Sequence, residues 1–433
     1  MSETLYKLVA KDEGEGAPTQ DISEEASDVM QANFGKQVLA SVASKTGDQL
    51  TKPGLILTWL LTATGAPALT IGLLAPVREA GSLLPQMWFA NFISRHPIKK
   101  HFWVLGSLLQ GLSVSGIAFA TLFLDGTALG WTVVGFLVVF SLSRAICSIS
   151  SKDLLGKTIP KTRRGRLSGL ASSISGWVAV AIGLFFAFNR SEEIPLLVFT
   201  ILISAAAIFW FAGAWMMSRV IEFASPPDEG DKPLREMLQS LSVLKEDKVF
   251  RRFCIARGLL ASTVLSMPFY VVLAHESTGG RIKSLGLLMI AGSLATALSG
   301  FVWGKLSDSS SHKTLALAGL AAGLTGCLTA GISYVEMSEF LAAFVFAALF
   351  FLIGLAHTGI RIGRKTYLVD YSKPDNRAKL VAVSNTLMGL VLLLSGSFGL
   401  LAEALGAQAV ILVFAILGII GGLLALSLPE TKQ

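Results

Sequence analysis

The chain has 433 residues, of which 52% are hydrophobic and only 15% charged, and its mean hydropathy is +0.64. A soluble protein of this length needs more charge to cover its surface, so the composition excludes an ordinary water-soluble globular protein. The net charge of +7 comes from basic residues in short clusters between apolar runs, which argues against nucleic-acid binding. The composition therefore predicts an integral membrane protein.

The first 32 residues are polar and acidic, so they do not form a cleavable signal peptide, and we expect a disordered cytoplasmic tail. Cys147, Cys254 and Cys327 lie far apart in apolar stretches and provide neither a disulfide framework nor a CxxC metal site. We expect reduced packing cysteines, no metal and no cofactor.

A helix that crosses the hydrocarbon core needs about 20 mostly apolar residues. Two segments, 33–63 and 253–275, are less uniformly apolar than the others. The first contains Lys36, Lys45, Asp48 and Lys52. If 54–76 were instead a single span, the apolar segment 82–94 would have no partner helix and the number of spans would be odd. Ten further runs are plain: 67–94, 102–124, 128–150, 167–188, 194–218, 284–304, 314–335, 340–360, 380–402 and 406–428. Twelve spans are therefore predicted.

Basic residues are distributed very unequally between the two sides of the predicted membrane. With the amino terminus inside, the outer loops carry only Arg190, Arg281 and Lys283, whereas each inner loop carries two or more Lys or Arg residues. An excess of Lys and Arg marks the cytoplasmic side. We therefore expect a multi-pass protein of the cytoplasmic (inner) membrane with both termini in the cytoplasm.

An internal repeat is visible at an offset of 213 residues, which aligns Lys100 with Lys313, Gly106 with Gly319 and Lys152 with Lys365. The repeat predicts two pseudo-symmetric six-helix bundles, an architecture that places a central site between the halves. The predicted parts are a tail over 1–32, a first half over 33–218, a cytoplasmic linker over 219–252, a second half over 253–428 and a cytoplasmic end over 429–433. Apolar residues at helical spacing over Pro233–Phe250 predict an amphipathic helix in the linker.

The second half contains Gly304-Lys-Leu-Ser-Asp308-Ser-Ser-Ser-His312-Lys313 between two spans. This sequence resembles the G-x-L-(A/S)-D-x-x-(G/S)-R-K loop of the major facilitator superfamily, which joins the second and third helices of each half. The resemblance covers the predicted spans, 33–428, and includes the Leu-Pro-Glu-Thr ending at 428–431. It implies a twelve-helix secondary transporter in which Asp308 latches the inner side shut. Gly304 would let helices pack closely, and His312 and Lys313 would lie at the inner headgroups.

The first-half counterpart is Asn91-Phe-Ile-Ser-Arg95-His-Pro-Ile-Lys99-Lys100. It keeps the cations Lys99 and Lys100 but has neither the glycine nor the aspartate of the motif. This departure weakens the expectation of an inner latch in the first half. It also leaves the subfamily open.

Searches for enzymatic motifs are negative. Gly156-Lys157-Thr158 looks like the end of a phosphate-binding loop, but Ser151 stands where the first glycine belongs and no strand precedes it. No G-x-S-x-G or H-E-x-x-H motif is present. The chain is therefore not expected to be an enzyme.

Ionisable residues within the predicted spans are costly and are functional candidates for that reason. Asp48 and Lys52 are one helical turn apart and can pair along one face. Arg78 and Glu79 lie near the middle of the second span and point in different directions. Arg257 is one turn inside the seventh span, where a snorkelling cation is the simplest interpretation.

The fourth and tenth spans contribute the remaining charges. Arg144 lies in the fourth span, and the repeat places His357 opposite it in the tenth, with Arg361 one turn later. The alternative is that Asp48–Lys52 and Arg78–Glu79 are structural ion pairs that only hold helices together.

These charges suggest a mechanism. Asp48 or Glu79 would carry a coupling proton, His357 would relay it, and Arg78, Arg144 and Arg361 would bind a polar or anionic organic solute. We therefore predict proton-coupled uptake by a monomer whose other partner is the lipid bilayer. Two alternatives stay open: efflux of amphipathic compounds, and a transporter-shaped sensor that moves no solute. A membrane-embedded enzyme is much less well supported.

Overall fold

The computed structural model describes the chain except for residues 1–21, 190–194, 225–241 and 432–433. In the described part, all regular secondary structure is helical. Ten helical stretches there are long and apolar enough to cross a membrane: α7 (Lys100–Ala120), α8 (Gly126–Thr158), α9 (Lys161–Ala187), α10 (Leu196–Ser218), α13 with α14 (Lys248–Leu260 and Ser262–Ser277), α15 (Ile282–Ser309), α16 (Ser311–Ile332), α17 (Glu339–Tyr371), α18 with α19 (Pro374–Ser395 and Phe398–Leu405) and α20 (Ala407–Leu426). The all-α membrane fold predicted from the sequence is confirmed.

The first two predicted spans are built from shorter helical pieces. The first consists of α3 (Met30–Leu50), η1 (Pro53–Leu57) and α4 (Thr58–Ala63), and the second of α5 (Ala68–Leu83) and α6 (Gln86–Ser94). Together with the ten continuous stretches, they are consistent with twelve spans.

The break in the first span follows from a Pro-Gly pair. Pro53 has no backbone N–H and a fixed φ, so α3 ends before it, and Gly54 takes non-helical dihedrals inside the π-helical turn η1. The Lys52 carbonyl accepts the N–H groups of Leu55 and Ile56 at 3.0 and 2.9 Å. The Lys52 carbonyl, which the break releases from α3, is thus satisfied.

Part of the predicted disordered tail is ordered. Residues 1–21 lie outside the described part of the chain, but α2 spans Glu24–Asp28 and α3 already begins at Met30. Ser23 caps α2 by accepting the Ala26 N–H at 3.3 Å. Phe34 and Val38, on the first turns of α3, pack with Ile159 and Leu167. This apolar contact, which composition alone did not reveal, explains the order.

The linker is described only at its two ends. Half of the predicted amphipathic helix, residues 233–241, lies outside the described residues; the described half contains α12 (Val243–Glu246) and the start of α13. The predicted domain boundaries therefore stay a prediction.

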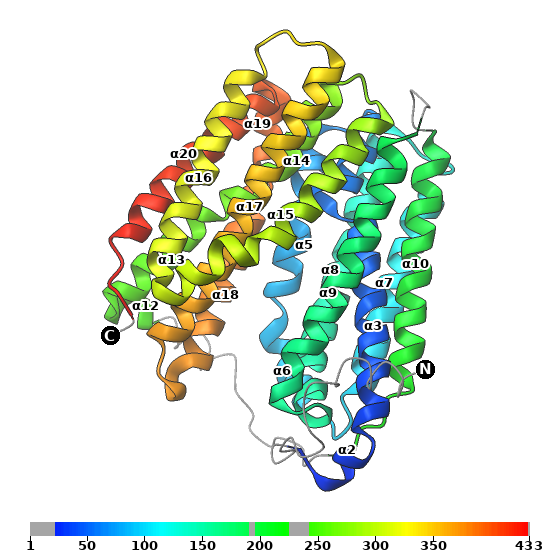
Figure 1. Ribbon diagram of the computed structural model, residues 1–433, viewed down its shortest axis with the longest axis vertical. Helices are drawn as coiled ribbons and strands as arrows, with labels where there is room; N and C mark the ends of the chain where they lie inside the picture. The colour runs from blue at the N-terminus through cyan, green and yellow to red at the C-terminus, as the bar shows by residue number, and fades with distance from the viewer. Residues whose placement is uncertain (1–21, 190–194, 225–241, 432–433) are drawn as a thin grey trace.

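Helices α3 to α10 and helices α13 to α20 form two groups that lie side by side (Figure 1). The described chain ends, before α2 and after α20, both lie toward the lower ends of their groups in this view. We call this lower end the terminal end and the other the far end. Contacts between the groups run through three sets of helices: α9 with α15, α5 with α18 and α19, and α14 with η1, α4 and α5.

Glycines show where α9 and α15 touch. A Cβ placed on Gly183, near the far end of α9, would lie 3.0 Å from the Gly286 carbonyl oxygen of α15. Gly165 and Gly176 share the helical face of Gly183, because they lie whole turns away from it, yet nothing lies within 4 Å of a Cβ at either position. The same holds for Gly304, five turns from Gly286 on α15. The two helices therefore meet at the far end and diverge toward the terminal end.

The contact at the far end can be tested with matched substitutions on one face of α9. Gly183→Leu would overpack the crossing with α15, at a cost of about 1–3 kcal/mol, whereas Gly176→Leu would meet no neighbour. We expect the apparent Tm of the purified protein to fall by several degrees for Gly183→Leu and to stay unchanged for Gly176→Leu. Equal effects of the two substitutions would contradict the described crossing.

Candidate functional site

Asp48 is the centre of a group of charges near the middle of the first bundle. Its carboxylate accepts hydrogen bonds from Arg78 at 2.7 Å and from Arg144 at 2.7 and 2.6 Å, so that one side chain joins α3, α5 and α8. We call Asp48, Arg78 and Arg144 the charge cluster. The predicted Asp48–Lys52 pair is not formed: Asp48 pairs with Arg78 and Arg144, and Lys52 lies beyond the end of α3 at Leu50, so the helical spacing that the prediction assumed does not hold.

Packing fixes the position of the charge cluster. The Arg78 guanidinium lies over the ring of Phe140, 4.6 Å from its centroid, and Phe140 meets Trp210 edge to face at 5.1 Å. Trp210 in turn packs on α3 at Gly47, where a Cβ would lie 2.6 Å from the indole ring. A stacked guanidinium is held in one orientation, and so is the carboxylate bound to it.

The charge cluster is not sealed. The exposed fractions of the side chains are 11% for Arg78, 23% for Asp48 and 38% for Arg144. One turn before Asp48, Lys45 donates from Nζ to the Ser168 carbonyl at 3.0 Å and the Ser172 hydroxyl at 2.6 Å, and thereby joins α3 to α9. Arg144 is the most exposed member of the charge cluster and therefore the one most accessible to a solute.

The second group of helices faces this cluster with further cations. On α17, Arg361 and Arg364 are both within electrostatic range of His357, and Arg361 is also in range of Lys45 and Lys52. The Lys52 ammonium reaches α15, since a Cβ on Gly292 would lie 3.7 Å from its Nζ. Among the described residues, Lys52, Arg361 and Arg364 form no ion pair.

Glu79 lies between the two groups of helices. It is within electrostatic range of Arg78 and Arg144 in its own group and of Arg364 across the interface. It forms no ion pair within 4.0 Å with a described residue, so the alternative Arg78–Glu79 pair is not formed, and Arg78 binds Asp48 instead.

Arg257 is not a snorkelling cation. It is buried, with 8% of its surface exposed, and its guanidinium donates to the Ser384 hydroxyl and to the Asn385 carbonyl oxygen at 2.9 Å, both on α18. The Nε–H has no partner among the described residues. The Pro374–Ser395 helix brings these acceptors beside α13, which spacing within the seventh span could not show.

The described charges in this region are strongly unbalanced. Basic side chains within electrostatic range of one another outnumber the described carboxylates in range of them, Asp48 and Glu79. The basic members include Lys45, Lys52, Arg78, Arg144, Arg257, Arg361, Arg364 and Lys365. Sequence analysis did not select Lys45 and Arg364 and misplaced Arg257, because the depth of a charge in a span does not reveal which helices surround it.

The predicted gating motif forms the α15–α16 turn. Asp308 is exposed in the last turn of α15, and His312 is buried in the first turn of α16 beside exposed Lys313. His312 Nδ1 lies 3.6 Å from the Glu430 carboxylate, which also accepts from the Ser310 hydroxyl at 3.2 Å. The expected close packing at Gly304 is not found, since nothing lies within 4 Å of a Cβ there and the helices diverge at this end.

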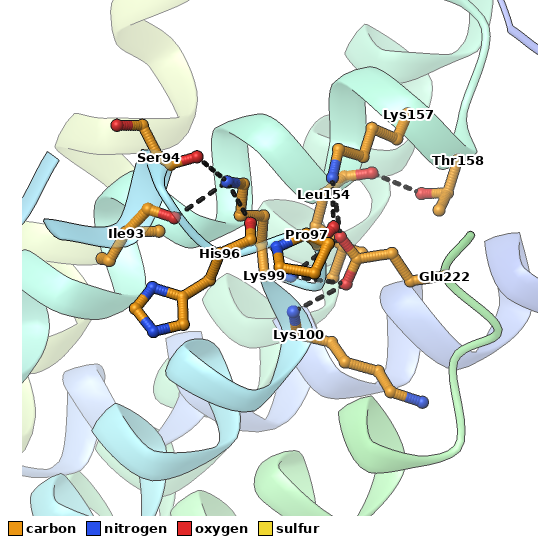
Figure 2. Close-up of polar contacts among 10 residues, drawn as sticks. All are labelled: Ile93, Ser94, His96, Pro97, Lys99, Lys100, Leu154, Lys157, Thr158 and Glu222. Atoms are coloured by element: carbon orange, nitrogen blue, oxygen red, sulfur yellow. Dashed lines mark hydrogen bonds and ion pairs between the residues drawn. The ribbon is translucent and has the colours of Figure 1, made fainter. Parts of the chain in front are cut away.

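In the first half, which lacks the aspartate of the motif, a carboxylate from outside the loop binds the start of α7. Glu222 accepts the backbone N–H of Lys99 at 2.9 Å and of Lys100 at 2.7 Å, at the start of α7, and the Lys157 ammonium at 3.0 Å (Figure 2). A carboxylate at a helix N-terminus satisfies free N–H groups and complements the helix dipole. The side chain of Glu222 is completely buried.

The two lysines complete the connections of this turn. Lys99 Nζ donates to the carbonyls of Ile93 and Ser94 at 2.8 Å, at the end of α6 (Figure 2), and Lys100 Nζ donates to Val220 at 2.9 Å just after α10. Cations at helix C-termini are favourable for the same reason that anions are at N-termini. Lys99 and Lys100 are therefore structural caps in this conformation.

The same arrangement recurs in the second half. Glu222 lies four residues after the end of α10, and Glu430 lies four residues after the end of α20, each beside the first turn of the third helix of its half. The sequence interpretation included Glu430 only as part of the Leu-Pro-Glu-Thr ending and did not select Glu222. Their equal distance is measured from the ends of α10 and α20 and is not visible from the predicted apolar runs, which end at 218 and 428.

Comparisons with known proteins agree with this architecture. Residues 267–433 match the family model of the Major Facilitator Superfamily. Among curated proteins, no sequence matches the chain. Among solved structures, the xylose transporter XylE from E. coli in an inward-open conformation is 13% identical, with a TM-score of 0.66 over 93% of this chain and 97% of that one.

Two further solved structures have the same sequence identity and slightly higher TM-scores. The D-xylose-proton symporter is 13% identical, with a TM-score of 0.69 over 92% of this chain and 98% of that one. The nucleoside transporter NupG is 13% identical, with a TM-score of 0.68 over 91% of this chain and 99% of that one. The chain therefore has the major facilitator fold, and the resemblance inferred from the second-half motif is confirmed.

The buried glutamate can be tested by removal. Glu222→Ala leaves the Lys157 ammonium and the first N–H groups of α7 without their carboxylate, and breaking a buried ion pair costs about 3–5 kcal/mol. We expect a clear fall in apparent Tm, measured by thermal unfolding in detergent. Glu246→Ala, at an exposed position of α12, is the matched control and should leave the Tm unchanged. If both variants unfold together with the parent, Glu222 does not hold this turn.

Proposed function

We propose that the chain is a secondary transporter that moves a small anionic organic solute by alternating access. The observation that carries the proposal is the excess of basic side chains in the set that contains Asp48 and Glu79, where the cations outnumber these two carboxylates. Unpaired charge within a membrane protein is costly and is retained where it binds something. An anion that entered this region would reduce the repulsion among the cations.

A route for the solute is supported by the divergence of α9 and α15. Ionisable side chains at this depth do not face lipid, so we infer that the exposed surface of Arg144 faces water between the two groups of helices. That water would reach the terminal end, where Gly165, Gly176 and Gly304 have no neighbour across the interface. With the terminal end in the cytoplasm, as the distribution of basic residues predicts, this conformation is inward-facing.

The charge, rather than the fold, selects the class of solute. The similar structures include a xylose transporter, a nucleoside transporter and a POT family transporter in complex with a thioalcohol-conjugated peptide, so the fold accommodates chemically different solutes. Guanidinium groups bind carboxylate and phosphate in a bidentate geometry. Arg144 and Arg361, one from each group of helices, are the pair we propose to hold the anionic group.

Glu79 is a better candidate than Asp48 for the coupling proton. Protonation of Asp48 would disrupt its hydrogen-bonded ion pairs with Arg78 and Arg144, which join α3, α5 and α8. Glu79 has no such ion pair among the described residues, and its attraction to Arg364 crosses the interface. Protonation of Glu79 would therefore weaken a contact between the halves without dismantling the first bundle.

The alternatives make different predictions. An efflux pump for amphipathic compounds would need a mainly apolar and aromatic site, and the charges described above favour an anion instead. A sensor without transport would bind solute but show no exchange across reconstituted vesicles. Solute counterflow in proteoliposomes distinguishes a transporter from a sensor.

Solute class can be tested by ligand-induced stabilisation. Purified protein is screened by thermal shift against carboxylated and phosphorylated metabolites and against neutral sugars and nucleosides, since a ligand that binds the folded state raises its apparent stability. We expect stabilisation by a set of anions only. Arg361→Ala should weaken binding of the best anion at least tenfold, whereas Arg219→Ala, at an exposed position after α10, should not. Stabilisation by neutral compounds alone would contradict the proposal.

Proton coupling is tested in proteoliposomes with the anion found in that screen. Glu79→Gln should abolish uptake driven by a pH gradient and preserve counterflow, because the solute site remains. Asp48→Asn should abolish both, because Arg78 and Arg144 lose their shared carboxylate. Glu276→Gln, exposed near the far end, is the control. Normal gradient-driven uptake by Glu79→Gln would show that Glu79 does not carry the proton.

A further inference from the structure

The second group of helices contains an apolar cavity of about 670 Å³ on the side away from the charge cluster. It lies between α13, α14, α18 and α20, and its walls include Cys254, Gly258, Leu387, Val391 and Phe414. Arg251 is the one charged side chain among its lining residues. A cavity with this lining suits a long hydrocarbon group with an anionic end.

The cavity is long enough to hold a lipid chain of one leaflet. Its lining runs from Arg251, in the first turn of α13, to Leu265 on α14, a distance of about 21 Å at 1.5 Å per residue. One leaflet contributes about half of the roughly 30 Å of hydrocarbon in a bilayer. The cavity therefore extends from the terminal end to beyond the middle of the membrane.

The cavity opens sideways between α13 and α18. The lining residues Ile255, Val391 and Leu394 are 50%, 40% and 77% exposed, and in a membrane these faces meet lipid. A chain of a bilayer lipid can thus enter from the side without crossing the protein.

The mouth at the terminal end is basic. Four basic side chains there, Lys245, Lys248, Arg251 and Arg252, are exposed, against one exposed carboxylate, Glu246. Arg251 uses one nitrogen to donate to the Leu244 carbonyl at 3.3 Å. The nearby Asp247 carboxylate is already engaged, because it accepts from the Phe250 N–H at 2.9 Å and the Tyr371 hydroxyl at 2.6 Å. Clustered cations at the headgroup level attract anionic lipids.

We propose that this cavity is a binding site for an anionic phospholipid, with one acyl chain between α13 and α18 and the phosphate beside Arg251. The site is separate from the charge cluster, and the proposal does not depend on the transported solute. An acyl chain there would fill the space between α13, α18 and α20 and stabilise the second bundle.

Two substitutions test the contributions of the acyl chain and of the headgroup separately. Gly258→Leu fills the cavity, and its Cβ is tolerated because the nearest atom, on Val391, would lie 3.9 Å away. Arg251→Gln removes the cation and keeps the length of the side chain. The matched controls are Gly300→Leu, where nothing lies within 4 Å of a Cβ on α15, and Arg219→Gln, an exposed arginine after α10.

The test uses delipidated full-length protein with phosphatidylglycerol or phosphatidylcholine of the same acyl chains, and native mass spectrometry counts bound lipid. We expect the parent to retain one phosphatidylglycerol at least fivefold more tightly than phosphatidylcholine. Gly258→Leu should lower retention of both lipids severalfold, Arg251→Gln should remove the preference, and the controls should match the parent. Equal retention of the two lipids by the parent, or unchanged retention by Gly258→Leu, would overturn the proposal.

Discussion

The structure of the first bundle depends on one carboxylate. Asp48 accepts hydrogen bonds from Arg78 and Arg144 and so joins three helices at the middle of the membrane, where a single unpaired charge would be strongly unfavourable. It neutralises only part of the local charge. The remaining cations, which come from both groups of helices, leave an electropositive region, and this excess is the basis for proposing an anionic solute.

Most of the fold could be predicted from the sequence because the bilayer makes each span visible as an apolar run of fixed length. The motif from Gly304 to Lys313 then indicated the superfamily, and the repeat aligned the two halves. The first span was the least certain, because Lys45, Asp48 and Lys52 interrupt its apolar run. In the structure, that span is also the one broken by Pro53 and Gly54, next to the charge cluster.

The candidate site could be predicted as a set of residues but not as a set of contacts. The sequence places Asp48, Arg78, Arg144, His357 and Arg361 at similar depths, whereas their partners depend on how separate helices are oriented. Asp48 therefore seemed able to pair with Lys52, its neighbour in sequence, and Arg257 seemed free to reach the surface. Glu222 shows the same limit, because its role depends on the chain after α10 returning to the start of α7.

The most direct measurement tests whether position 361 lies in an aqueous region and whether that region is electropositive. In a variant with Cys147, Cys254 and Cys327 replaced and Arg361→Cys introduced, the new thiol is labelled in membranes with membrane-impermeant methanethiosulfonates of similar size, one anionic and one cationic. An electropositive region open to the terminal end predicts that the anionic reagent reacts faster, and only from the cytoplasmic side. Faster reaction with the cationic reagent, or no reaction from either side, would contradict the account.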